Sequence, residues 1–174
     1  SYGFNPDIYI IDVATHSKKR MTTNPAIDTE PTWSPDGRTL AFTSDRGGSP
    51  QIYSMPSNYP DAEPKRITFQ GRQNLRPRFS PDGKSLAVVT QQGGYHIAVI
   101  DLATNQMTVL THGSVDVSPD WAPNGQALIY ERNTNRGTEL ATVSKDGLID
   151  RSLGAPGDVQ EPAWSSFLDP DPMQ

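Results

Sequence analysis

The sequence predicts an all-β protein built from a repeated unit of about 43 residues. The motif Trp33–Gly37 (Trp-Ser-Pro-Asp-Gly) returns as Phe79–Gly83 and as Trp121–Gly125, and a fourth copy begins at Trp164. The aromatic residues that open these copies are 46, 42 and 43 residues apart. In each complete copy an Asp-Gly or Asn-Gly pair lies between two apolar runs and supplies the positive φ that a tight hairpin turn requires. A period of this size is typical of the blades of a β-propeller.

Each complete repeat is expected to form a blade of four antiparallel strands. The inner strands are expected at 31–34, 77–80 and 119–122, each followed by a hairpin turn and three further strands. We expect a partial blade over 1–30, whole blades over about 31–75, 76–117 and 118–159, a lone inner strand over 160–168, and a disordered tail over 169–174. Residues 1–168 would then be the C-terminal portion of a longer, six-bladed ring. Such an incomplete ring exposes strand edges, which favours self-association.

Composition excludes several function classes. The chain carries 15 Lys and Arg against 20 Asp and Glu, a net charge of −5, and we expect no nucleic-acid partner. It has no cysteine, which excludes disulfides and thiol catalysis. No run of eighteen apolar residues is present, so we expect no direct membrane insertion. The first residues lack an initiator Met and a signal sequence, and we expect the N-terminus to be a processing or cloning boundary.

The sequence offers no candidate for catalysis or for a metal site. His16, His96 and His112 do not have the spacing of metal ligands, and no Gly-x-Ser-x-Gly motif is present. The Asp-Gly pairs are better explained by turn geometry than by calcium binding. The aromatic series Trp33, Phe79, Trp121 and Trp164 favours packing between blades over a stacking platform. We therefore expect a binding protein that is not an enzyme and needs no cofactor.

Several stretches resemble the TolB family of periplasmic propellers, in the family's order. They are Asp7–Asp12, Thr29–Trp33, Leu40–Asp45, Pro64–Thr68, Ala122–Gly125, Ser144–Gly147 and Pro162–Ser165. The resemblance covers nearly the whole chain and departs from the family at Ser166-Phe167 and in the tail from Leu168 to Gln174, which extends past the family's usual end. It implies a periplasmic scaffold of the Tol–Pal system that binds the peptidoglycan-associated lipoprotein Pal, communicates with TolA and supports outer-membrane integrity and constriction at cell division. It also implies that some colicins use the same surface. A Ca²⁺ ion in the propeller channel is compatible with the resemblance, but the sequence places none.

Strand direction predicts where a partner binds. In antiparallel blades the start of each inner strand lies on the same face as the loop between the second and third strands, opposite the Asp-Gly turns. The polar residues collected on this face are Thr29, Glu30, Asp45, Arg46, Arg76, Ser118 and Glu161, with Gln91–Gln92 and Arg132–Asn133. Such a rim suits a protein epitope that docks over the axis, although a merely solvated rim is the alternative. Thr29 and Glu30 are the first candidates for partner binding, because Thr29–Trp33 matches the family best. The resemblance implies that Pal binds at this end of the propeller.

A second function class remains open. The Trp-Ser-Pro-Asp-Gly unit also occurs in the non-catalytic propellers of prolyl oligopeptidase-type serine peptidases. In that case an α/β-hydrolase segment should follow the propeller, whereas this sequence ends after Trp164 in a short acidic tail. The sequence therefore favours the scaffold.

Overall fold

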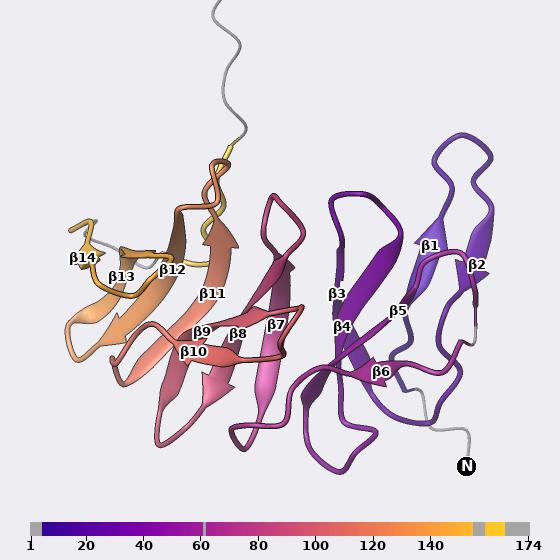
Figure 1. The fold of residues 1–174 in the computed structure, drawn as a ribbon, viewed down its shortest axis with the longest axis horizontal. Helices are drawn as coiled ribbons and strands as arrows, with labels where there is room; N and C mark the ends of the chain where they lie inside the picture. The colour runs from indigo at the N-terminus through magenta and orange to yellow at the C-terminus, as the bar shows by residue number, and fades with distance from the viewer. Residues whose placement is uncertain (1–4, 61, 155–158, 166–174) are drawn as a thin grey trace, which may run out of the picture.

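The chain folds into sheets that follow one another side by side (Figure 1). Their strands pair antiparallel except for a single parallel bridge between Tyr95 and Val115. The computed structural model describes residues 5–60, 62–154 and 159–165, and these form fourteen strands. The first two, β1 (Tyr9–Ile11) and β2 (Lys18–Arg20), pair as a hairpin. In the described part of the chain no helix is long and apolar enough to cross a membrane. The predicted all-β class is confirmed.

Three four-stranded blades follow the hairpin. The first blade consists of β3 (Asp28–Trp33), β4 (Thr39–Ser44), β5 (Gln51–Pro56) and β6 (Lys65–Arg66). The second consists of β7 (Asn74–Phe79), β8 (Ser85–Gln91), β9 (Tyr95–Asp101) and β10 (Met107–Val109). The third consists of β11 (Val115–Trp121), β12 (Ala127–Thr134), β13 (Gly137–Ser144) and β14 (Asp150–Ser152). Consecutive strands within each blade pair antiparallel, which is the predicted blade.

The described blades form an open row and not a closed ring (Figure 1). This agrees with the predicted incomplete propeller. The inner strands β3, β7 and β11 begin three or four residues earlier than predicted, at Asp28, Asn74 and Val115, because pairing continues on both sides of a bulge. Self-association through open strand edges stays a prediction.

The hairpin turns are held by a recurring side-chain arrangement. In the first blade the Ser34 hydroxyl donates to Oδ1 of Asp36 at 2.6 Å, and the same oxygen accepts from the Arg38 amide at 3.0 Å. Gly37 has a φ of 70°, which glycine adopts without steric cost. The same hydroxyl-to-carboxylate bond recurs in the pairs Ser80–Asp82 and Ser144–Asp146. These Asp-Gly pairs therefore form turns, as predicted.

Apolar side chains pack between neighbouring blades. Buried residues between the first and second blades are Ala41, Ile52, Ile67, Leu86, Val88, Ala98 and Ile100. Those between the second and third are Ala87, Val89, Ile97, Val99, Leu110, Trp121, Leu128, Tyr130, Ala141 and Val143. Alternate residues of β8 thus face opposite neighbours, because successive side chains of a strand point to opposite sides. The second blade is buried on both faces.

The aromatic series does not behave as one set. Trp121 is 5% exposed and its indole donates to the backbone oxygen of Arg78 in the preceding blade. Trp33 and Trp164 are 48% and 41% exposed, so the prediction of inter-blade packing is wrong for these two. Trp121 lies against β7, the inner strand of the preceding blade. The described residues before Trp33 form only the β1–β2 hairpin and supply no such inner strand.

The predicted lone inner strand over 160–168 is not a strand in its described part, which ends at residue 165. No strand of the described residues pairs with it. Instead the Trp164 amide donates to Oδ2 of Asp120 at 2.8 Å, and the Glu161 amide donates to the Glu131 carboxylate. Residues 166–168 and the predicted tail over 169–174 lie outside the described residues.

The turn carboxylates predict an acid-sensitive fold. Hydrogen bonds from Ser34, Ser80 and Ser144 lower the pKa values of Asp36, Asp82 and Asp146 below the ordinary 3.8. Carboxylates with lowered pKa values stabilise the fold above pH 3.8, and this stability is lost as pH falls through 3.8 and the lower folded-state values. We expect the urea midpoint to decline below about pH 4, and to decline less steeply in the triple variant Asp36→Asn, Asp82→Asn, Asp146→Asn. Glu63→Gln, at an exposed position, is the control and should keep the original slope. Equal slopes in the triple variant and the original chain would contradict this account.

Candidate partner-binding surface

The two ends of the blades define two faces of the molecule. One end carries the Asp-Gly and Asn-Gly turns, and we call it the turn face. The other carries the starts of the inner strands and the β4–β5, β8–β9 and β12–β13 loops, and we call it the loop face. This assignment follows from the antiparallel pairing within each blade. The predicted partner surface belongs to the loop face.

Each inner strand carries the same bulge, placed immediately before a proline. In β3 the register shifts by one residue between Thr29 and Thr32, and β7 and β11 show the same shift. The residues before the prolines have a left-handed backbone, with φ of 56° at Glu30, 52° at Arg76, 55° at Ser118 and 47° at Glu161. Proline has no amide hydrogen, so it fits a position outside regular pairing. A bulge redirects the side chain of its extra residue, here toward the axis.

The redirected side chains meet around Arg76. Its Nε lies 3.3 Å from Oε1 of Glu30, its Nη1 donates to the Ser118 hydroxyl, and its Nη2 lies 3.9 Å from Oε1 of Glu161. Oε2 of Glu30 also accepts from the Arg76 amide at 2.9 Å and from the Thr43 hydroxyl at 2.7 Å. We call Glu30, Arg76, Ser118 and Glu161 the axial cluster. They line an open cavity of about 330 Å³.

The ion pairs of the axial cluster are solvated. The side chains of Glu30 and Arg76 are 31% and 37% exposed, and that of Glu161 is 80% exposed. Exposed ion pairs contribute only about 0–1 kcal/mol to stability. The Arg76–Glu161 pair, at 3.9 Å, is therefore easily exchanged for a contact with another charged group.

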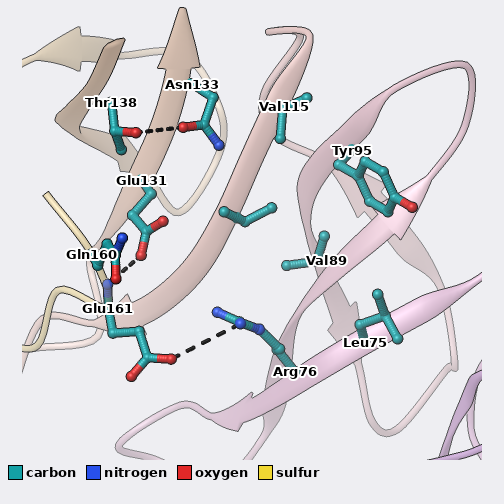
Figure 2. A pocket seen from close by; sticks show the side chains of 11 residues that line it. Leu75, Arg76, Val89, Tyr95, Val115, Glu131, Asn133, Thr138, Gln160 and Glu161 are labelled. Carbon is teal, nitrogen blue, oxygen red and sulfur yellow. Dashed lines mark hydrogen bonds and ion pairs between the residues drawn. The ribbon is translucent and has the colours of Figure 1, made fainter. Parts of the chain in front are cut away.

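A second cavity adjoins the axial cluster between the second and third blades (Figure 2). It has a volume of about 430 Å³, and we call it the loop-face pocket. Its apolar wall consists of Leu75, Val89, Tyr95, Val115 and Val117. Its polar rim consists of Arg76, Glu131, Asn133, Thr138, Gln160 and Glu161. Figure 2 shows Arg76 and Glu161 facing each other where the pocket meets the axial cluster. An apolar floor with a few converging polar groups is the usual composition of a binding pocket.

The sequence predicts Arg46 on the rim, but its side chain is largely buried and pairs with Asp28. Its Nη2 contacts both carboxylate oxygens of Asp28, at 3.0 and 2.9 Å. The guanidinium also lies 5.0 Å from the ring centre of Tyr53 and 5.4 Å from that of Phe42. The Arg46 side chain is 10% exposed and that of Asp28 is fully buried. Arg46 therefore stabilises the first blade, and its part in partner binding stays a prediction.

Asp45 and Thr29 lie apart from the axial cluster. Oδ1 of Asp45 accepts from the Ile27 amide at 2.8 Å and so fixes the connection that enters β3. Thr29 pairs with Thr43 one residue before the bulge. Neither residue lines either of the two cavities described above. The structure thus brings together four of the seven predicted residues.

The third blade repeats the buried Asp–Arg pair. Arg132 Nε donates to Oδ1 of Asp116 at 3.1 Å, and Nη2 donates to Oδ2 of Asp150 at 2.6 Å. The Tyr130 hydroxyl donates to Asp150 at 2.6 Å, and burial together with this bond raises the pKa of Tyr130 above 10. Burial acts to lower the pKa of Arg132, but its bonds to Asp150 and Asp116 outweigh burial and raise it. Both groups keep their protons at neutral pH.

Sequence reasoning missed the apolar wall of the loop-face pocket. A comparison of the repeats could have indicated this wall. The residue before the bulged residue is Thr29 in the first repeat, but it is Leu75 in the second and Val117 in the third. Apolar residues at this point in two successive blades indicate an apolar patch beside the axis. The remaining wall residues, Val89, Tyr95 and Val115, come from three strands that only the fold brings together.

The described residues do not by themselves form a carboxylate site for a calcium ion on the axis. Nowhere among them do three or more His, Cys, Asp or Glu side chains come together as a metal-binding group. In the axial cluster the Arg76 guanidinium lies between Glu30 and Glu161 and compensates their charge. The rings of His96 and His112, both within the second repeat, lie 6.4 Å apart and form only a pair.

Comparison with known proteins identifies close relatives. The model of the TolB beta propeller domain matches residues 1–168. The Tol-Pal system proteins TolB of Bordetella pertussis and Bordetella bronchiseptica are each 46% identical to the chain over 162 residues, or 92% of its length. The crystal structure of TolB from Acinetobacter baumannii superposes with a TM-score of 0.85 at 41% identity and covers 94% of the chain.

The chain spans only part of these relatives. It covers 37% of the Bordetella pertussis protein, 36% of the Bordetella bronchiseptica protein and 41% of the Acinetobacter baumannii chain. The sequence matches and the structural match thus indicate the same family over most of the chain.

The placement of Arg46 predicts a stability effect. Arg46→Met leaves the buried carboxylate of Asp28 without its partner, and removing one member of a buried pair costs about 3–5 kcal/mol. We expect urea unfolding to show a loss of about this size. Arg136→Met, at an exposed loop position, is the matched control and should change stability by less than about 0.5 kcal/mol. A similarly small effect of Arg46→Met would show that the pair does not stabilise the first blade.

Proposed function

Because this chain belongs to the TolB β-propeller family, we propose that its loop face is a protein-binding surface of the Tol–Pal system. The protein acts as a periplasmic scaffold and not as an enzyme. One observation carries the proposal: the charged axial cluster opens directly into the apolar loop-face pocket, and the two share Arg76 and Glu161. Apolar side chains that contribute binding energy therefore lie next to charged side chains that orient the partner.

The partner that we propose is the lipoprotein Pal. An epitope of Pal inserts an apolar side chain between Val89 and Val117, where burial contributes about 1.5–3 kcal/mol. Its backbone and polar groups bond to Asn133 and Gln160 on the rim, and its charges meet Arg76. The weak Arg76–Glu161 contact then gives way to contacts with the epitope. Charges of this kind set orientation and specificity more than affinity.

The walls of the loop-face pocket are held rigidly by the blades. Its wall residues lie on strands of the second and third blades, whose shared core includes the fully buried Leu128 and Tyr130. Side chains held by regular strands lose little conformational entropy on binding, which favours affinity. The pocket therefore needs no rearrangement of the blades to receive a side chain.

The wider role that we propose is based on the family. As part of a TolB protein, the chain would also communicate with TolA, be exploited by colicins and support outer-membrane integrity and constriction at cell division. The alternative, a propeller from a serine peptidase, has less support because the close relatives are TolB proteins. The fold alone does not distinguish an enzyme from a scaffold.

A calorimetric titration of the soluble domain of Pal into this protein tests the proposal. We expect Glu161→Lys, Val115→Asp and Glu30→Lys each to weaken binding at least about tenfold, or 1.4 kcal/mol. Val115→Asp places a charge on the pocket wall, and Glu30→Lys places a second cation beside Arg76. Glu161→Lys is the cleanest variant because this side chain is 80% exposed.

The matched control reverses a charge on the other face. Lys84→Glu, in the turn of the second blade, should leave Pal affinity unchanged. Thermal unfolding of each variant separates a loss of fold from a loss of binding. Unchanged affinity in both Glu161→Lys and Val115→Asp would overturn the placement of Pal on the loop face.

A further inference from the structure

A second pocket lies on the turn face, between the first and second blades. Its volume is about 400 Å³. Its floor is apolar and consists of Ile67, Phe79, Leu86 and Leu102. Ile67 and Leu86 belong to the buried core between the two blades, and Phe79 and Leu102 pack against that core while remaining partly exposed. We call this cavity the turn-face pocket.

Two carboxylates, those of Asp36 and Asp82, line the turn-face pocket. They come from equivalent turns of neighbouring blades. The turns are in close contact, since a Cβ on Gly83 would lie 3.4 Å from Cδ of Pro35. Gly83 also has a φ of 69°, so both its conformation and its surroundings fix the second turn against the first. The separation of the two carboxylates is therefore set by the packing of the blades.

Each carboxylate uses only one oxygen within its own turn. Oδ1 of Asp36 accepts from the Ser34 hydroxyl and the Arg38 amide, and Oδ1 of Asp82 accepts from Ser80 and Lys84 in the same way. Among the described residues, nothing donates a hydrogen bond to Oδ2 of either carboxylate. The serine bonds lower both pKa values, so both groups are ionised at neutral pH.

We propose that the turn-face pocket binds a basic side chain, arginine or lysine, of a partner polypeptide. The aliphatic stem of such a side chain packs on Phe79 and Leu102. Its charged end bonds to Oδ2 of Asp36 or Asp82, and charge-assisted bonds are the stronger kind. Lys65 is the cationic residue among those that line the pocket, and Arg38, Lys84 and Lys145 also act electrostatically on the two carboxylates. The proposed contact therefore depends on the two carboxylate oxygens and the apolar floor, and not on an excess of negative charge.

The first and second blades each carry a carboxylate at this turn, whereas the third blade does not. At the equivalent turn of the third blade, Ala122 and Asn124 replace the serine and the aspartate. Oδ1 of Asn124 still accepts from the Gln126 amide at 3.0 Å, so the turn forms without a carboxylate. Turn structure therefore does not require the charge at Asp36 and Asp82. The site lies on the opposite face from the axial cluster and does not depend on the proposed function.

A titration followed by NMR tests the proposal. The probe is the tetrapeptide acetyl-Gly-Leu-Arg-Gly-amide, and the matched peptide carries citrulline, a neutral isostere, in place of arginine. We expect the arginine peptide to shift the backbone amide signals of Gly83 and Asn105, which line the pocket, and the citrulline peptide to bind about tenfold more weakly. Asp36→Asn and Asp82→Asn should each weaken the arginine peptide about tenfold.

The control is Asp146→Asn, which alters a turn with the same serine-to-aspartate hydrogen bond, between β13 and β14, that does not line this pocket. It should leave affinity for the arginine peptide unchanged. Asn124 shows that the turn accepts asparagine, and the dispersion of the NMR signals verifies the fold of each variant. Equal binding of the two peptides, equal effects of all three variants, or no shift at the pocket residues with about 10 mM peptide would overturn the proposal.

Discussion

The left-handed residue before each inner-strand proline is the constraint on which the binding surface depends. Such a backbone costs about 1–2 kcal/mol for a residue with a side chain. At Glu30 the cost is offset by two bonds to its carboxylate, one of them from the amide of Arg76 in the next blade. At Glu161 the amide is held by Glu131. The strained positions therefore also connect successive blades, and local strain of this kind commonly marks functional sites.

Buried polar groups near the starts of the inner strands also stabilise the blades, through bonds within a blade or between two blades. Asp28 and Asp116 each pair with an arginine of their own blade. In the second blade Asn74 takes this place and donates to Oε1 of Gln51 in the first blade at 2.8 Å. An amide both donates and accepts hydrogen bonds, so it can bridge two blades without an unpaired charge. The change from aspartate to asparagine thus turns a bond within a blade into one between blades.

The two faces of the molecule differ in how their charges are used. On the loop face, Arg76 and its two glutamates partly compensate one another and remain solvated beside an apolar pocket. On the turn face, Asp36 and Asp82 keep one oxygen each available above an apolar floor. The first arrangement suits a partner with mixed charge, and the second suits a cation. One repeated blade thus presents two different chemistries, because its two ends are built from different segments of the repeat.

The sequence alone determined the all-β class, the four-stranded blade and the position of the Asp-Gly turns, because a period near 43 residues and turn residues act locally. It also placed Glu30, Arg76, Ser118 and Glu161 together, since equivalent repeat positions share a face. Only the tertiary structure decided that Arg46 is buried against Asp28, that Trp33 is exposed, and that separate strands build the pocket beside Arg76. Burial and pairing depend on which neighbouring blade covers a residue, and no local pattern records that neighbour.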